Sequence, residues 1–147
     1  MKRLLIMLLV LCFAVGLALA ASDVCPEAVK AAIIKAYPGA TVESCKKEEE
    51  KGTTVYEAKV TTKQALRLEL DVAPDGKILQ TEQKIGLETV PNAVLEGFHA
   101  KYKDVKPTAA EKQTKADGTV QYELAFGAGK QKREVTLSES GKILEEE

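Results

Sequence analysis

The chain repeats itself once, and this repeat limits the folds that it can adopt. Residues 24–29, VCPEAV, match residues 89–94, TVPNAV, at an offset of 65. Residues 75–79, DGKIL, recur as SGKIL at 140–144 with the same offset, and VYE at 55–57 recurs as QYE at 121–123 with an offset of 66. Two copies, 22–83 and 88–147, therefore account for nearly all of the chain after residue 20. The short link between them, 84–87, leaves no room for two widely separated domains.

Each copy begins with the residue spacing of an amphipathic helix. In the first copy Pro26 stands where the first turn of a helix tolerates proline, and Pro38 and Gly39 end the pattern. The second copy has the same stripe but no proline-glycine stop after it. The stripe residues are Ala28, Val29, Ala32, Ile33, Ala36 and Tyr37, then Val94, Leu95, Phe98 and Tyr102.

After each helix the apolar period changes to two, which is typical of half-buried antiparallel strands. Apolar residues alternate with charged ones over 54–60 and 66–72, and Val120, Tyr122, Leu124 and Phe126 alternate with polar residues in the second copy. Turn sequences such as Pro74-Asp75-Gly76 separate the strands. The sequence thus predicts an α+β fold in which one helix plus a four-stranded antiparallel sheet occurs twice, with the helices packed on one face. A unit of about 60 residues is marginal alone, so we expect a shared core or one continuous sheet.

The N-terminal segment has the pattern of a cleaved secretory signal. A short basic start, Lys2-Arg3, precedes an apolar run from Leu4 to Leu19, and small residues end it at Ala20. Removing residues 1–20 takes two of the 21 basic residues and leaves all 22 acidic ones, which argues against a strongly basic nucleic-acid binder. We therefore expect a periplasmic or secreted protein with no stable membrane span after cleavage.

Cleavage also removes Cys12 and leaves Cys25 and Cys45 in an oxidising compartment, where a pair of cysteines is most simply a disulfide. A helix of about 18 Å, followed by a strand of similar length that runs back, returns Cys45 to the helix start beside Cys25. The spacing of the two cysteines is not that of a redox-active or metal-binding pair.

Five segments resemble those of a known family: 24–29 (VCPEAV), 36–40 (AYPGA), 55–60 (VYEAKV), 68–72 (LELDV) and 74–79 (PDGKIL). Their order resembles that of the PepSY-like family of small exported bacterial proteins, also described as beta-lactamase-inhibitor-like. The resemblance covers both copies. It implies a tandem helix-plus-sheet fold, a role in binding or restraining other proteins, peptidases among them, and no cofactor. Inhibitors of the beta-lactamase type present an aromatic-rich sheet, whereas this chain has no Trp and 5% aromatic residues, which argues against beta-lactamase inhibition.

Residues with catalytic chemistry are sparse. His99 is the only histidine and follows Phe98 on the second helix, where a place at the edge of the apolar stripe or in solvent explains it. The chain has no Gly-x-Ser-x-Gly motif and no glycine-rich phosphate loop before a helix. We therefore expect no enzymatic activity and no catalytic residues.

The sheet face opposite the helices is the candidate binding surface. Its charged members are Glu57, Lys59, Arg67, Glu69, Asp71, Glu123, Lys132 and Glu134, and Val55, Gln121, Ala125 and Thr136 share the face. The acidic residues could supply oxygen ligands for a metal ion. Lysine and arginine side chains alternate with them, however, which favours cross-strand ion pairs such as Glu57 with Arg67. We therefore predict no metal site.

This pattern favours a non-enzymatic exported module that binds a protein or peptide and modulates a peptidase or another envelope protein. A small-ligand or divalent-cation binder, with a site between the copies or at the acidic cluster, is the alternative. A structural envelope protein that assembles through its edge strands is a third hypothesis.

Overall fold

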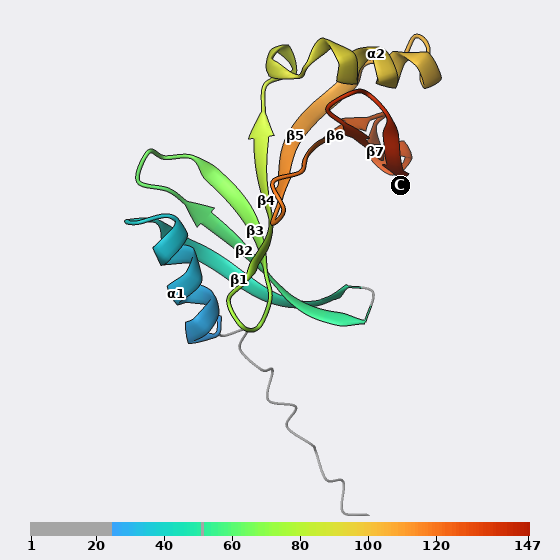
Figure 1. Cartoon of the computed structure of the whole chain (residues 1–147). Coiled ribbons are helices and arrows are strands. Elements are labelled where there is room, and N and C mark those ends of the chain that lie inside the picture. The colour runs from blue at the N-terminus through green and yellow to red at the C-terminus, as the bar shows by residue number, and fades with distance from the viewer. Residues whose placement is uncertain (1–24, 51) are drawn as a thin grey trace, which may run out of the picture.

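A computed structural model describes residues 25–50 and 52–147, so the predicted signal at 1–20 lies outside the described residues. The chain runs from a helix through four strands and then through a second helix and four more strands (Figure 1). The elements are α1 (Glu27–Ala36), β1 (Thr41–Glu50), β2 (Thr53–Thr61), β3 (Arg67–Val72), β4 (Ile78–Ile85), η1 (Leu87–Thr89), α2 (Asn92–Lys101), β5 (Pro107–Lys115), β6 (Val120–Phe126), η2 (Gly129–Gln131), β7 (Arg133–Ser138) and β8 (Ile143–Glu146).

All eight strands form one antiparallel sheet in sequence order, from β1 to β8. The two halves join where β4 pairs with β5, with Thr81 opposite Thr114 and Ile85 opposite Ala110. The structure is therefore α+β, with one open eight-stranded sheet and two helices. Of the two arrangements that we expected, a continuous sheet is the one observed.

Each helix packs its stripe on its own part of the sheet. In α1 the buried residues are Val29 and Ile33, which join Ala58, Val60 and three residues of β3 in one apolar cluster. In α2 they are Val94 and Phe98, which join a second cluster from β5, β6 and β7. Because the buried residues fall into two clusters, the halves share a sheet but not a core.

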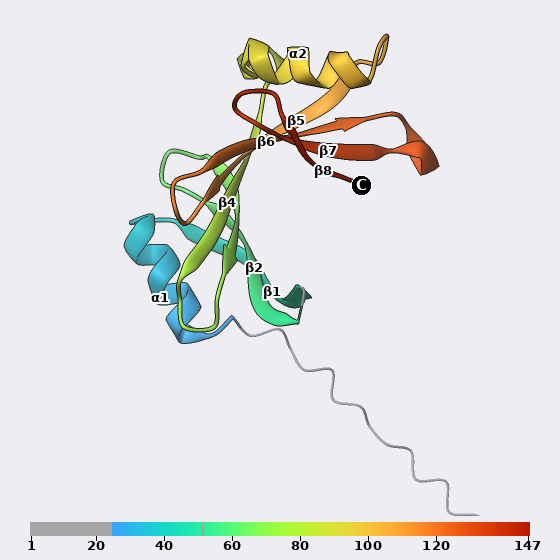
Figure 2. The same ribbon diagram turned by 45° about the vertical axis from the view of Figure 1, so that its right-hand side comes forward.

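Both helices lie on the same side of the sheet. Residues directly opposite each other on paired strands point to the same side, and the partners run Val60, Leu68, Gln83, Lys112, Tyr122 and Leu137 from β2 to β7. The first two pack under α1 and the last two under α2. The prediction that the helices occupy one face is confirmed, and Figure 2 shows both helices outside the bend of the sheet.

The helix ends have local causes. Pro26 is the N-cap of α1, and the helix ends at Ala36, just before the Pro38-Gly39 stop, where Gly39 has a φ of 80°. The second helix ends similarly, although Asp104, with a φ of 62°, takes the left-handed conformation there. An aspartate tolerates this conformation better than most residues, which explains how the helix stops without a glycine.

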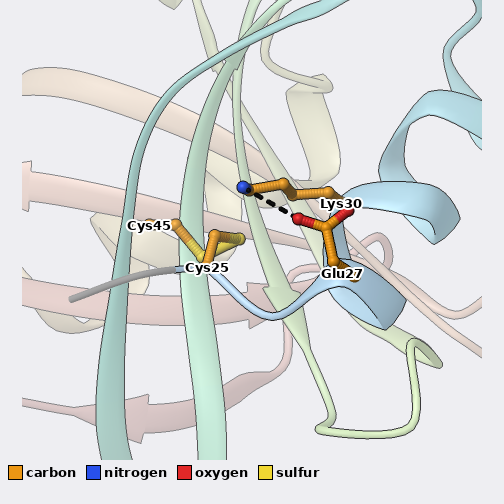
Figure 3. The surroundings of a disulfide bond; sticks show 4 residues. All are labelled: Cys25, Glu27, Lys30 and Cys45. Atoms are coloured by element: carbon orange, nitrogen blue, oxygen red, sulfur yellow. Dashed lines mark hydrogen bonds and ion pairs between the residues drawn. A yellow bond between two sulfur atoms is a disulfide. The ribbon is translucent and has the colours of Figure 1, made fainter.

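The predicted disulfide is present. Cys25 precedes α1 and Cys45 lies in β1, with their Cα atoms 5.3 Å apart and the sulfur atoms bonded (Figure 3). Both cysteines are buried. On the first turn of α1, Lys30 forms an ion pair with Glu27 at 3.3 Å. The link ties the start of the described chain to the edge strand β1.

Two sequence expectations are wrong. Leu66, which we placed among the buried strand residues, precedes β3 in a turn, and 46% of its surface is exposed. Val55, which we placed on the exposed sheet face, is buried and lies opposite Glu48 of β1.

Candidate binding face

The open face is the side of the sheet that carries no helix. Its central row of cross-strand partners is Lys59, Glu69, Glu82, Gln113 and Gln121, one residue from each strand from β2 to β6. A neighbouring row contains Lys84, Glu111, Glu123, Thr136 and Glu145, from β4 to β8. Polar side chains thus cover this face across both halves.

The open face is concave. A hollow of about 510 Å³ lies on it and is lined by residues from β3 as well as by Glu145 and Glu147 at the other end of the sheet. Five carboxylates line this acidic hollow: Asp71, Glu82, Glu123, Glu145 and Glu147. Lys115 is the only cation among the described residues that line it. The sheet therefore curls around a pocket with excess negative charge.

A buried glutamine connects the two halves inside this hollow. Gln113 in β5 is 4% exposed and donates from Nε2 to Glu82 at 3.1 Å and to Glu123 at 3.2 Å. Its own Oε1 accepts from Gln121 at 2.6 Å. Gln80 also donates to Glu82, at 2.7 Å. Since an unpaired buried amide is costly, this network fixes the two glutamates side by side.

Both of these glutamates have raised pKa values. Burial is the main cause for Glu82 and raises its pKa to about 7, with added repulsion from Asp71, Glu111 and Glu123. Burial likewise raises the pKa of Glu123 to about 7, helped by Glu134 and Glu111. A carboxyl with a pKa near 7 loses its proton near neutral pH, so the charge of the hollow changes in the physiological range.

We expect Glu82→Gln to stabilise the protein at pH 8 but not at pH 4. In the unfolded chain this carboxyl ionises near pH 4.5, whereas in the folded chain it holds its proton up to about pH 7. The folded state therefore loses stability as pH rises between these values, and the full penalty remains above pH 7. Because the carboxyl keeps contact with solvent, screening reduces the penalty to about 1–2 kcal/mol. Urea unfolding at pH 4, 6 and 8 measures it.

The exposed Glu145→Gln is the matched control and should shift the free energy of unfolding by a few tenths of a kcal/mol at most. An equal effect of Glu82→Gln at pH 4 and pH 8 would contradict the assignment.

The structure places the predicted face residues on this side of the sheet but pairs them differently. Glu57 is opposite Asp71, and Arg67 is opposite Thr61, so the expected pair of Glu57 with Arg67 is not a cross-strand pair. Lys59 contacts Glu69 at 3.1 Å. Lys132 and Glu134 form a second ion pair, beside Glu123 in a smaller hollow.

The concave shape buries residues that we expected to be displayed. Gln121, Ala125 and Thr136 are each less than 9% exposed. Sequence reasoning also missed Glu82, Glu111 and Gln113, which occupy the middle of the face. Residues 80–84 and 111–115 are all polar, so these two strands carry polar residues on both sides, and periodicity alone does not orient them.

Two further findings bear on the alternatives. Within residues 25–50 and 52–147, no three or more His, Cys, Asp or Glu side chains are arranged to hold a metal ion. In the same ranges, no helix combines the length and apolar character that a membrane span requires.

The fold and the open face define a small α+β protein whose curved antiparallel sheet carries helices outside and polar side chains inside. Known structures share this architecture. A BLIP-like protein from Bacteroides fragilis NCTC 9343 is 25% identical, with a TM-score of 0.62, and the match covers 84% of this chain and 86% of that chain. A protein from Bacteroides eggerthii DSM 20697, proposed to be periplasmic, is 19% identical with a TM-score of 0.66, over 84% and 88%. A DUF2874 family protein from Bacteroides uniformis ATCC 8492 is 16% identical with a TM-score of 0.65, over the same shares.

The last two likenesses concern the fold alone. No family model matches the chain, and no curated protein matches it. The chain is thus similar to a BLIP-like protein in sequence and fold, which fits a BLIP-like exported family, while the PepSY-like assignment stays a prediction. The descriptions of these three neighbours indicate no catalytic family.

Proposed function

We propose that this protein is a non-enzymatic exported module that binds another protein through the concave open face. The observation that carries this proposal is the acidic hollow, because it spans strands of both halves and is left uncovered by the helices. The likeness to a BLIP-like protein and to one protein proposed to be periplasmic supports an exported binding role. A signal peptide at residues 1–20, cleaved near Ala20, completes this proposal.

Charge defines the kind of partner segment. The hollow has five carboxylates and one lysine among its described lining residues, so a loop that carries lysine or arginine complements it. Such a cation also favours the ionised forms of Glu82 and Glu123, whose pKa values burial raises to about 7. Binding of a cationic loop is therefore stronger above pH 7 and weaker at high salt.

The two halves, 22–83 and 88–147, are copies of one PepSY-like unit under this proposal. Each contains a helix and four strands in the same order. The 65-residue offset aligns Pro26 with Pro91, both N-caps, and Tyr37 with Tyr102, both C-caps. A partner that contacts the centre of the open face would then touch both copies.

The test is capture of partners from an envelope extract of the source organism, followed by mass spectrometry and by titration of the purified partner. We expect one stoichiometric protein whose affinity falls at least tenfold when Glu82→Lys and Glu123→Lys place positive charge in the hollow. Arg67→Glu with Glu69→Arg, on the same face, should weaken binding less, because these residues lie outside the acidic hollow.

The control is Lys35→Glu on α1, an exposed residue on the helix side. It changes the net charge without touching the open face and should leave affinity unchanged. If Lys35→Glu strengthens binding by as much as each hollow variant weakens it, net charge and not the open face governs the interaction, and the proposal is wrong.

A further inference from the structure

A second hollow lies on the helix side of the sheet, between the end of α1 and the strands β3, β4 and β5. We call it the Tyr37 hollow. Its volume is about 390 Å³, and Tyr37, Gln64, Leu66, Thr81, Gln83 and Thr114 are among its lining residues. Among the described residues that line it, none is charged. In a chain in which 29% of residues are charged, this neutral lining sets the Tyr37 hollow apart from the acidic hollow.

The same place in the second half is closed. The 65-residue offset aligns Tyr37 with Tyr102 and Thr81 with Glu146. The Tyr102 hydroxyl donates to Glu146, which also pairs with Lys101, and the Arg133 guanidinium lies 5.5 Å from the centre of the Tyr102 ring. Charged side chains thus cover Tyr102, which is 9% exposed.

In the first half the tyrosine has a neutral neighbour. The Tyr37 hydroxyl is 3.4 Å from the Thr81 hydroxyl, and Tyr37 is only half-buried. The two halves differ here because β4 pairs with β5 on its far side, whereas β8 is the edge strand of the sheet. Thr114 of β5 therefore completes the lining of the Tyr37 hollow.

The turn before β3 presents an apolar wall to this hollow. Leu66 is 46% exposed, and Ala65 before it has a φ of 62°, a conformation that alanine rarely adopts. Two backbone bonds hold the turn, from Thr62 N to Leu66 O at 2.8 Å and from Ala65 N to Thr62 O at 2.9 Å. Leu66 and the Tyr37 ring thus offer apolar surface beside the hydroxyl and amide groups.

We propose that the Tyr37 hollow binds a neutral saccharide. Threonine hydroxyls and glutamine amides both donate and accept hydrogen bonds, as sugar hydroxyls do. The tyrosine ring and Leu66 pack against the C–H surface of a sugar ring. A charged ligand would lose hydration without gaining an opposite charge, and a wholly apolar ligand would leave Thr81, Gln83 and Thr114 unpaired.

Amide NMR titration of the ¹⁵N-labelled protein tests this proposal. The probes are maltotriose and the trisaccharide of N-acetylglucosamine, with trigalacturonic acid as the charged comparison and capped trialanine as the peptide comparison. We expect a neutral trisaccharide to shift the signals of Thr81, Gln83 and Thr114 with a dissociation constant in the millimolar range, and the other two probes to bind at least tenfold more weakly.

Variants locate the site. Thr81→Val combined with Thr114→Val keeps the shape of the hollow and removes two hydroxyls, and should weaken saccharide binding at least fivefold. Tyr102→Phe, the matching tyrosine in the second half, should leave binding unchanged, and the spectrum of each variant reports that it is folded. Absence of shifts with both neutral probes overturns the proposal. So does stronger binding of the charged or peptide probe, or unchanged binding in the threonine variant. Because the open face is on the other side of the sheet, this result is independent of the proposed protein partner.

Discussion

Replacing Gly97 with alanine is expected to lower the free energy of unfolding by about 3 kcal/mol. Alanine normally favours a helix over glycine by about 1 kcal/mol, but here the helix α2 touches the turn before β8. A Cβ at Gly97 would overlap the Gly141 carbonyl and lie 2.7 Å from the Gly141 Cα. Both are backbone atoms, so no side chain can rotate to relieve the overlap. Urea unfolding of the variant measures the loss.

The first half supplies the matched control. The 65-residue offset aligns Gly97 with Ala32 and Gly141 with Gly76. Ala32 faces Gly76 and already carries a methyl group, so α1 leaves room at this place that α2 does not. We expect Ala32→Gly to lower the free energy of unfolding by about 1 kcal/mol, through helix propensity alone. A neutral or stabilising Gly97→Ala would contradict the close approach of α2 to its turn.

Removing the disulfide is expected to lower the free energy of unfolding by a similar amount. The double variant Cys25→Ser and Cys45→Ser should lose about 3 kcal/mol, because the bond closes a loop with a sequence separation of 20 and restricts the unfolded chain. Urea unfolding of the oxidised wild-type protein and of the variant gives the difference. Thiol labelling of the unfolded, unreduced protein, in a form that lacks Cys12, should find no free cysteine.

The second half allows a converse experiment. At the offset of 65, Cys25 aligns with Val90 and Cys45 with Ala110, both buried in the cluster under α2. If the halves are copies, Val90→Cys with Ala110→Cys should form a second disulfide on oxidation and raise the unfolding free energy. Two free thiols in the oxidised variant would count against the copy proposal.

Much of the fold follows from local patterns. Pro26 and the Pro38-Gly39 stop bound α1 to within a few residues, and the alternation over 54–60 orients β2 with Tyr56, Ala58 and Val60 toward the helix. The cysteine pair also follows from the sequence, since the lengths of the helix and strand alone return Cys45 to Cys25. These features depend on neighbours along the chain or on chain length.

The candidate site is predicted less well by the sequence than the fold is. The charged residues of β2 and β3 were placed on the correct face, but their cross-strand partners were not, because a pairing register depends on turn geometry as well as on alternation. Glu82 and Gln113 were missed, since β4 and β5 carry polar residues on both sides where the sheet passes between the two helices.

The sequence by itself determines which segments are helix and strand, which side of β2, β3 and β6 is apolar, and which cysteines meet, because each of these depends on short-range periodicity or on the lengths of neighbouring elements. Only the tertiary structure decides that β4 pairs with β5 and that the sheet curls. Curvature brings Asp71 of β3 and Glu145 of β8 to one hollow, and it buries Glu82 and Glu123 there. The acidity of the hollow therefore results from long-range pairing, which no local pattern encodes.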